Sequence, residues 1–334
     1  MAVPSVRLAS SGWQAVRQDE KHTRGYYLGE LLAKYRDMQV VNWNGEPTPL
    51  VDADNNILVG LGGFPPDRNG SNWQRDVAKP AAEAMRAAAI DIYTLPRWMR
   101  KRYGRSSNRR GGHAAKSVGP SMGGGQPHPQ NLSHTPRLLA IFSALFALKC
   151  FERIAGWGNT LFEAFSPDLF NYYRTKLTEV CENDPRIRLN FPLKFSVFST
   201  ATFNFGPATI TLPHIDFRNL AWGWCSITAL GDYDPDFGGH LVLWDLKLVI
   251  RFPPGSTIFI PSAILRHSNT NIRDHEYRFS FTQFTPAAIF RWAYKRQSKF
   301  TTAAEHERRR RDKERRWNEG VKMFQKWDGP IRTL

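Results

Sequence analysis

Residues 240–261 of the chain read HLVLWDLKLVIRFPPGSTIFIP. Runs rich in β-branched, aromatic and other apolar residues are separated there by a Pro-Pro-Gly turn, a pattern typical of strands joined by tight turns. Similar runs recur on both sides, and the sequence predicts strands at 194–204, 208–213, 224–230, 240–244, 247–252, 256–261 and 277–285. Many short strands at this spacing favour a sandwich or barrel of the jelly-roll class.

Helical spacing dominates outside the strand-rich part of the chain. An Ala-rich stretch over 80–92 begins with proline and predicts a helix. An apolar stripe over 138–148 predicts a second helix, and Ser166-Pro167 is a typical start for a third. Beyond Phe300, acidic and basic side chains are interleaved, so we expect a charged helix with a solvated face. Helices and strands together predict an α+β fold.

Composition divides the 334 residues into four regions. Hydrophobic residues make up 41% of the chain and aromatic residues 13%, which is enough for a sizeable buried core. We expect an N-terminal region packed on the core (1–95), a basic loop rich in Gly, Ser and Pro (96–130), a jelly-roll core with supporting helices (131–293) and a charged C-terminal helix (294–334).

The charge balance points to a polyanionic partner. Lys and Arg number 46 against 30 Asp and Glu, for a net charge of +16. Residues 97–116 hold eight of these basic residues and no acidic one, so this stretch is either a solvated linker or an arm that binds phosphates. The candidate contacts to a nucleic-acid backbone are Arg100, Lys101, Arg102 and Arg105.

No membrane or export signal is visible in the sequence. The longest apolar run, over 138–148, is too short to span a bilayer, and the first 13 residues lack the apolar core of a signal peptide. No membrane association is therefore expected.

The cysteines, Cys150, Cys181 and Cys225, lie far apart in apolar surroundings. Reduced, buried thiols are therefore expected.

The strand-rich region carries the residues of a candidate metal site. In His214-Ile215-Asp216 the imidazole and the carboxylate are two residues apart, so on a strand they point to the same face. His267 follows 53 residues later and is the preferred third ligand over the alternatives His240 and His275. Two nitrogens and one carboxylate suit non-haem Fe(II), with positions left open for a co-substrate and O2.

An arginine follows His267 at a suggestive spacing. Arg278 lies 11 residues after His267, and Ser280 follows it two residues later. A buried guanidinium binds a carboxylate through two hydrogen bonds, and a serine hydroxyl can add a third. This pair can therefore hold the distal carboxylate of 2-oxoglutarate. Separate core histidines and a structural arginine are the alternative interpretation.

Several of these motifs together resemble the TET/JBP family of Fe(II)- and 2-oxoglutarate-dependent nucleic-acid dioxygenases. The similarity covers about residues 123–293 and is greatest to the copies expanded in mushroom-forming fungi. The matching segments are Gly124–Pro127, Asn204–Pro207, His214–Asn219, Gly238–Trp244, Pro253–Thr257, Pro261–Ala263, His267–Asn269 and Arg278–Phe284.

The resemblance implies a double-stranded β-helix core and oxidation of 5-methylcytosine. It assigns Fe(II) to His214, Asp216 and His267, which would act as the catalytic centre with O2. It assigns the co-substrate 2-oxoglutarate to Arg278, with Ser280 close by.

The resemblance also implies contacts to a flipped base. Asn219, the last residue of the HxDxxN motif, would face the base, and Phe284 would stack on it. Animal members carry a base-contacting histidine eight residues after the arginine, where this chain has Pro286. The chain therefore departs from the animal members at a residue that contacts the base.

The function expected from sequence is oxidation of 5-methylcytosine in DNA, to 5-hydroxymethylcytosine and further, by base flipping. Three alternatives stay open: the same chemistry on N6-methyladenine or on a methylated RNA base, a non-catalytic DNA-binding jelly roll, and a protein hydroxylase. The expected partner is methylated duplex DNA. A nuclear location and a monomeric state are expected as well.

Overall fold

Two β-sheets form the centre of the structure, a computed structural model that describes residues 7–9, 11–18, 24–94, 111–123, 126–297 and 312–329. The larger sheet has seven strands in the order β2-β3-β11-β8-β13-β7-β4, and all neighbours are antiparallel. Its strands are β2 (Thr48–Val51), β3 (Ile57–Gly63), β4 (Ala114–Val118), β7 (Thr200–Phe205), β8 (Cys225–Asp232), β11 (Thr257–Ile260) and β13 (Tyr277–Phe284).

The second sheet has four short strands in the order β1-β10-β9-β12. The β1–β10 pair is parallel, and the other two pairs are antiparallel. The strands are β1 (Gln39–Val41), β9 (Leu241–Leu243), β10 (Leu248–Ile250) and β12 (His267–Asn269); a separate short pair is formed by β5 (Pro120–Ser121) and β6 (Gln130–Asn131).

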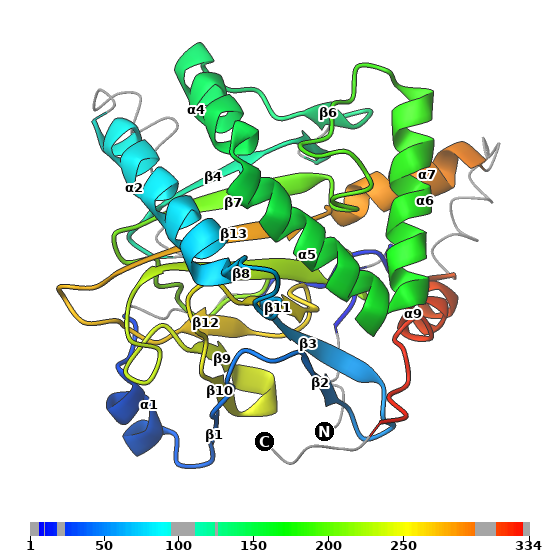
Figure 1. The fold of residues 1–334 in the computed structure, drawn as a ribbon. Coiled ribbons are helices and arrows are strands. Elements are labelled where there is room, and N and C mark those ends of the chain that lie inside the picture. Colours follow the sequence, from blue (N-terminus) through cyan, green and yellow to red (C-terminus); the bar gives the residue numbers. More distant parts are fainter. Residues whose placement is uncertain are drawn as a thin grey trace.

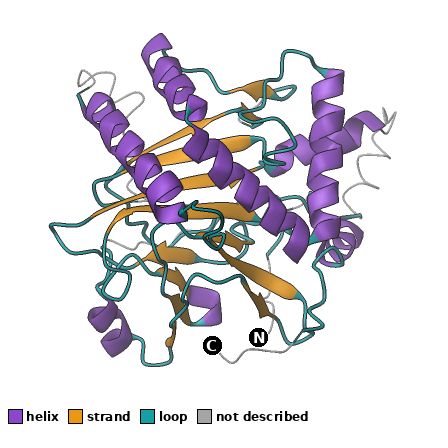
Figure 2. Ribbon diagram, in the orientation of Figure 1, coloured by secondary structure: helices purple, strands orange, loops and turns teal. Residues whose placement is uncertain are grey.

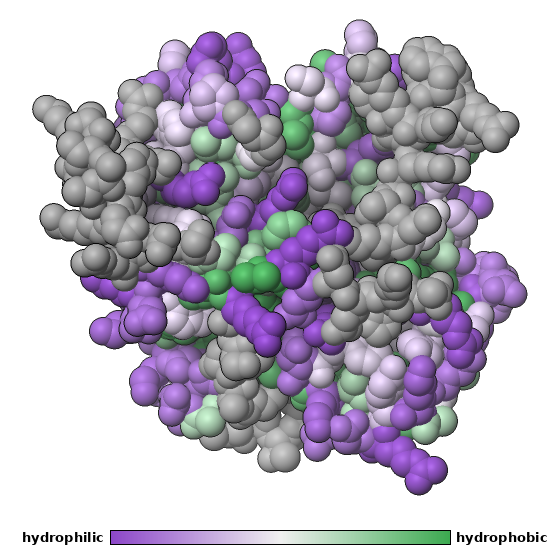
Figure 3. All heavy atoms as spheres, turned by 180° about the vertical axis from the view of Figure 1, so that it is seen from behind, coloured by the Kyte–Doolittle hydropathy of each residue, from purple (hydrophilic) through white to green (hydrophobic). Residues whose placement is uncertain are grey.

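Helices α2, α4 and α5 cover one face of the seven-stranded sheet, whereas α6 and α7 lie beside it (Figures 1 and 2). The opposite face of the molecule carries a small apolar area near its centre, bordered by hydrophilic side chains (Figure 3). None of the described helices is both long and apolar enough to cross a membrane. The helices are α1 (Leu28–Lys34), η1 (Gln74–Ala78), α2 (Lys79–Tyr93), α4 (Pro136–Ala147), α5 (Lys149–Phe165), α6 (Pro167–Asn183), η3 (Trp244–Leu246), α7 (Ala287–Gln297) and α9 (Lys313–Val321).

Strand β13 shows how alternating residues make one face of the large sheet apolar and the other polar. Phe279 and Phe281 belong to the apolar cluster that packs under α2, α4 and α5. Arg278, Ser280 and Thr282 alternate with them and line a polar pocket on the other face. Because successive side chains in a strand point to opposite faces, one strand supplies both core and pocket.

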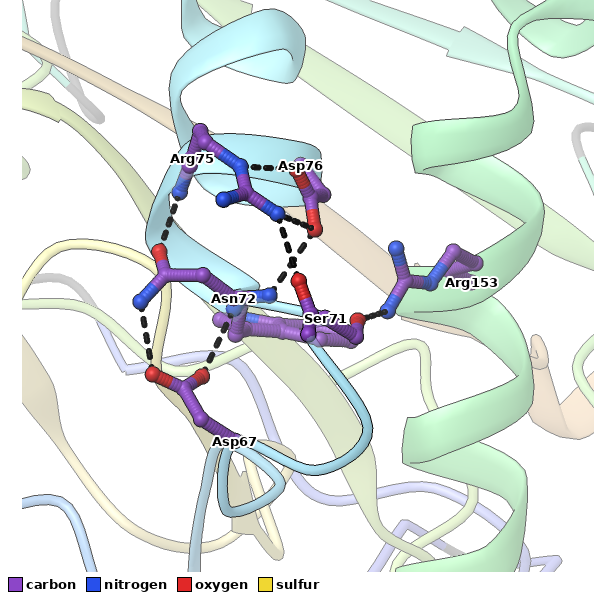
Figure 4. A network of polar contacts seen from close by, with 8 residues as sticks. Asp67, Ser71, Asn72, Arg75, Asp76 and Arg153 are labelled. Atoms are coloured by element: carbon purple, nitrogen blue, oxygen red, sulfur yellow. Dashed lines mark hydrogen bonds and ion pairs between the residues drawn. The ribbon is translucent and has the colours of Figure 1, made fainter.

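A polar network fixes the start of the η1–α2 helix and ties it to α5 (Figure 4). The backbone N–H of Asn72 donates to Asp76 (2.8 Å), and the side-chain amide of Asn72 donates to Asp67 (2.6 Å). Arg153 of α5 donates to the Ser71 hydroxyl (3.0 Å). The side-chain Oδ1 of Asn72 accepts from the backbone N–H of Arg75 (2.7 Å), so the first turn has partners that a helix start otherwise lacks.

The predicted helices at 80–92, at 138–148 and from Ser166 correspond to α2, α4 and α6. The sequence pattern missed α5, which lies between α4 and α6. The strand predicted at 208–213 is wrong, because this segment is irregular and carries only a single bridge, at Ala208.

The expectation of a loop throughout 96–130 is wrong over Ala114–Val118, which is strand β4 at the edge of the large sheet. Short β5 and β6 also lie within or at the end of this stretch. Residues 1–95 are more than a layer on the core, since β1 joins one sheet and β2 and β3 join the other. Of the predicted C-terminal helix, the structure describes α9.

Candidate active site

His214, Asp216 and His267 come together at one point. One ligand atom from each lies within 4.8 Å of the others. Nε2 of His214 is 4.0 Å from Asp216 Oδ1, and Nε2 of His267 is 3.9 Å from Asp216 Oδ2. Two imidazoles and a carboxylate at these separations are a donor set for one divalent transition metal.

Backbone pairing joins the two histidines although they are distant in sequence. The N–H of His214 donates to the His267 carbonyl (3.1 Å), and the N–H of His267 donates back (2.9 Å). This is an antiparallel bridge between the segment after β7 and strand β12. The two imidazole rings consequently lie side by side, with centroids 4.3 Å apart.

The tautomer of each histidine is set by a carbonyl. Nδ1 of His214 lies 2.7 Å from the Leu212 carbonyl, and Nδ1 of His267 lies 2.9 Å from the Leu265 carbonyl. A carbonyl oxygen only accepts, so each Nδ1 carries the proton. Nε2 then holds the lone pair, and this outer hydrogen bond is the usual way to orient a metal-binding histidine.

Asp216 is held by its main chain. Its N–H donates to the Ser262 carbonyl (2.8 Å), and its carbonyl accepts from the N–H of Asn219 (2.8 Å). Burial raises the pKa of the nearby Cys225 thiol to about 12, and the Asp216 carboxylate contributes to the increase. A neutral thiol, rather than a second anion, therefore lies near the carboxylate.

Arg278 is a buried cation in the same cavity. Its side chain is 1% exposed, and Nη1 donates to the Thr209 carbonyl (2.7 Å). Its buried Nε has no hydrogen-bond partner among the described residues, and no described carboxylate forms an ion pair with it. The rings of Tyr233 and Phe252 lie 5.7 Å from the guanidinium carbon. A buried charge without a counter-ion is costly, so the geometry calls for an anionic ligand.

Side chains with hydroxyl and amide groups line the cavity between Arg278 and the group formed by His214, Asp216 and His267. Ser280 follows on β13, and its hydroxyl accepts from the Asn204 side chain of β7 (3.0 Å). Asn204 lies directly opposite Ser280 in the sheet. We call the enclosing cavity the inner pocket; it is lined by Thr202, Asn204, Thr211, His214, Asp216, Asn219, Ile227, Leu241, His267, Asn269, Arg278, Ser280, Thr282 and Phe284.

His240 does not belong to the group of candidate metal ligands. Its ring Nδ1 contacts the Thr270 hydroxyl (2.9 Å), and the side chain is 1% exposed. Burial, together with the charge of Arg251, lowers the pKa of His240 to about 4. The other alternative ligand, His275, is solvent-exposed. His267, not His240 or His275, is the histidine that lies beside His214 and Asp216.

A second cavity, the outer pocket, adjoins the inner one. Asp216, Asn219 and Phe284 line both, so the candidate metal centre lies where the two meet. Pro286 is bridged to Asn219 along the backbone and also lines the outer pocket. The full lining is Arg17, Ser117, Ser121, Met122, Gly123, Gln126, Leu132, Asp216, Phe217, Arg218, Asn219, Phe284 and Pro286.

The structure thus brings the predicted metal, 2-oxoglutarate and base-contacting residues around one cavity system. The predicted backbone contacts Arg100, Lys101, Arg102 and Arg105 lie outside the described residues. Sequence analysis missed Asn204 as a partner of Ser280 and gave no role to Gln126. Only strand register could have identified Asn204, whereas Gln126 belongs to a segment that the family resemblance already included.

Comparisons with known proteins find similar solved structures but no similar sequence family. No family model and no curated protein matches the sequence. Among solved structures, the chain is similar to NgTET1 in complex with 5mC DNA, with 14% identity, a TM-score of 0.46 and coverage of 78% of this chain and 88% of that one. It is also similar to the viral collagen prolyl hydroxylase vCPH from Paramecium Bursaria Chlorella virus-1 in its 2OG complex, with 16% identity, a TM-score of 0.21 and coverage of 26% and 57%. The interpretation of the site rests on its own geometry.

Proposed function

We propose that the protein is an Fe(II)- and 2-oxoglutarate-dependent dioxygenase. The observation that carries the proposal is a His-Asp-His cluster that shares one cavity with a buried arginine lacking a carboxylate partner among the described residues. His214, Asp216 and His267 would hold the iron, and Arg278 with Ser280 would hold the distal carboxylate of 2-oxoglutarate. With O2, this pair of cofactors converts a C–H bond to C–OH and yields succinate and CO2.

The protein's own groups orient and shield that chemistry. The backbone carbonyls behind both histidines keep Nε2 directed at the metal position. Arg278, through Nε and its remaining guanidinium protons, offers a planar set of donors that matches a carboxylate. The two sheets around this site support the proposal that the core is a double-stranded β-helix, with β12 and β9 on one side and β13 and β8 on the other.

The proposed substrate is 5-methylcytosine in duplex DNA. A base inside a duplex cannot reach a buried metal, so the nucleotide must be flipped out. The outer pocket supports this, since the Phe284 ring and the Asn219 amide line it where it meets the metal cluster. The net charge of +16 favours a polyanion, and Arg100, Lys101, Arg102 and Arg105 are the proposed phosphate contacts. DNA as substrate also underlies the proposed nuclear location.

One observation favours a second substrate, N6-methyladenine. Pro286 lines the outer pocket and has no side-chain group that could hydrogen-bond a cytosine. The alternative keeps the same iron, co-substrate and stacking residues. It differs only in the base that the outer pocket accepts.

The test is oxidation of matched methylated duplexes under defined conditions. Protein is loaded anaerobically with Fe(II), 2-oxoglutarate and ascorbate, a 5-methylcytosine or N6-methyladenine duplex is added, and air is admitted. Nucleosides are measured by mass spectrometry and succinate is counted in parallel. We expect oxidised cytosine that disappears in His214→Ala. Succinate with oxidised adenine would establish the second substrate, and neither product despite bound iron would contradict the dioxygenase proposal.

A further inference from the structure

The outer pocket contains two side-chain amides, Gln126 and Asn219, and each has one end already engaged. Oε1 of Gln126 accepts from the backbone N–H of Gly123 (3.1 Å). A backbone N–H only donates, so the oxygen, not the nitrogen, of Gln126 must face Gly123. The Nε2 group has no hydrogen-bond partner among the described residues. Gln126 therefore offers a ligand two donor hydrogens.

In Asn219 the amide nitrogen, rather than the oxygen, is the atom that the protein binds. Its Nδ2 donates to the hydroxyl of Ser262 (3.1 Å), and Ser262 is 1% exposed. The main chain of Ser262 also binds the N–H of Asp216, so this anchor is continuous with the metal site. This bond uses one of the two Nδ2 hydrogens, whereas the carbonyl Oδ1 of Asn219 has no hydrogen-bond partner among the described residues. Asn219 therefore offers an acceptor.

One donor and one acceptor distinguish two classes of nucleobase. On their pairing edges, cytosine and adenine place an exocyclic amine, which donates, next to a ring nitrogen, which accepts. Thymine, uracil and guanine place a carbonyl, which accepts, next to a ring N–H, which donates. Recognition of a flipped base uses this same edge.

We propose that Gln126 is a specificity-determining residue, and that it and Asn219 select amino bases over keto bases. Asn219 accepts from the exocyclic amine, Gln126 donates to the neighbouring ring nitrogen, and Phe284 holds the ring by stacking. The inference rests on the proposed function, because it takes the substrate of this pocket to be a nucleobase. It applies to 5-methylcytosine and N6-methyladenine alike, and it excludes thymine, which also carries a 5-methyl group.

The test compares 5-methylcytosine with thymine, so that the methyl group is present in both substrates. Short single strands differing only at the central base remove the cost of opening a base pair. Fluorescence anisotropy without 2-oxoglutarate gives the ratio of affinities, and mass spectrometry of competing strands gives the ratio of turnover. We expect wild-type protein to prefer 5-methylcytosine by about 10- to 100-fold, the usual value of a paired base contact.

Gln126→Glu replaces the donor with an acceptor and should shift both ratios toward thymine by about tenfold or more. The added negative charge should weaken binding to both strands equally, so this effect cancels in the ratio of 5-methylcytosine to thymine. Gln130→Glu, on β6 and outside the outer-pocket lining, is the matched control and should leave the ratio unchanged.

Unchanged ratios in Gln126→Glu, or a wild-type preference for thymine, would overturn the inference. If wild-type protein oxidises no strand, the proposed function fails, while the anisotropy ratio still decides the role of Gln126.

Discussion

The inner and outer pockets share a wall but are built differently. In the inner pocket, His214, His267 and Ser280 each have a hydrogen bond to a group that is fixed by the fold. In the outer pocket, Gln126 and Asn219 keep one hydrogen-bonding end for a ligand, and Arg218 is exposed. Under the proposed function, the fold itself would set the reaction chemistry, whereas substrate choice would depend on a few side chains that substitutions can change separately.

Removing a metal ligand should have the largest effect and should be confined to the inner pocket. In His267→Ala, Fe(II) affinity should fall by more than about 100-fold, because losing even an outer hydrogen-bond partner of a metal ligand costs about 10- to 100-fold. Iron stoichiometry and succinate release measure this. DNA affinity should stay near the wild-type value, since phosphate contacts dominate it. The exposed His275→Ala is the control, and wild-type iron binding in His267→Ala would refute the assignment.

The next largest effect is expected at Arg278, the proposed anchor of 2-oxoglutarate. Arg278→Lys keeps the charge but loses the planar fork and its bond to Thr209, so 2-oxoglutarate should bind about 100-fold more weakly, or about 3 kcal/mol. The KM for 2-oxoglutarate measures the change. Arg273→Lys, at a half-buried position outside both pockets, is the matched control. Equal KM values for the two variants would show that Arg278 does not bind the co-substrate.

Acid should destabilise the fold through His240, behind the inner pocket. Burial lowers its folded pKa to about 4 from the ordinary 6.5, so the unfolded chain binds the proton more readily. Stability is therefore complete above about pH 6.5 and falls toward pH 4, by roughly 2–3 kcal/mol at pH 4.5. Urea midpoints at pH 7 and 4.5 measure the loss. His240→Gln should lose less on acidification, and an identical loss would contradict this origin.

The smallest effect is expected where the two pockets meet. Phe284→Ala removes a stacking surface worth about 1–2 kcal/mol, so affinity for a 5-methylcytosine strand should fall about tenfold. Phe284→Tyr should retain most of it. The salt dependence of binding should be unchanged in both variants, because no phosphate contact is altered. Unchanged affinity in the alanine variant would remove Phe284 from the substrate site.

The inner pocket could be anticipated from sequence much further than the outer one. The two-residue spacing of His214 and Asp216 indicates a shared site, although the segment is irregular and carries only a single bridge at His214. The alternation along the strand places Ser280 on the face of Arg278, and the family resemblance adds Phe284. Asn204 could not be found this way, because its place opposite Ser280 depends on the register of two strands far apart in the chain.

The composition of the basic stretch does not predict strand β4. Lys116 belongs to a basic stretch that predicts a loop, yet it is 6% exposed within β4. Its neighbour Ser117 pairs with Thr202, and the two hydroxyls lie 2.7 Å apart. Tertiary pairing overrides the composition here, and composition alone holds no signal for it.

The alternation along β13 has a consequence for the kinds of sequence change that this protein can tolerate. Substitutions on either face act one position at a time. A single-residue insertion or deletion within Tyr277–Phe284 would instead reverse the facing of every residue beyond it, moving phenylalanine side chains into the polar cavity and hydroxyls beneath the helices. Length variation among natural or designed variants should therefore be absent from this strand and should accumulate in the turns that flank it.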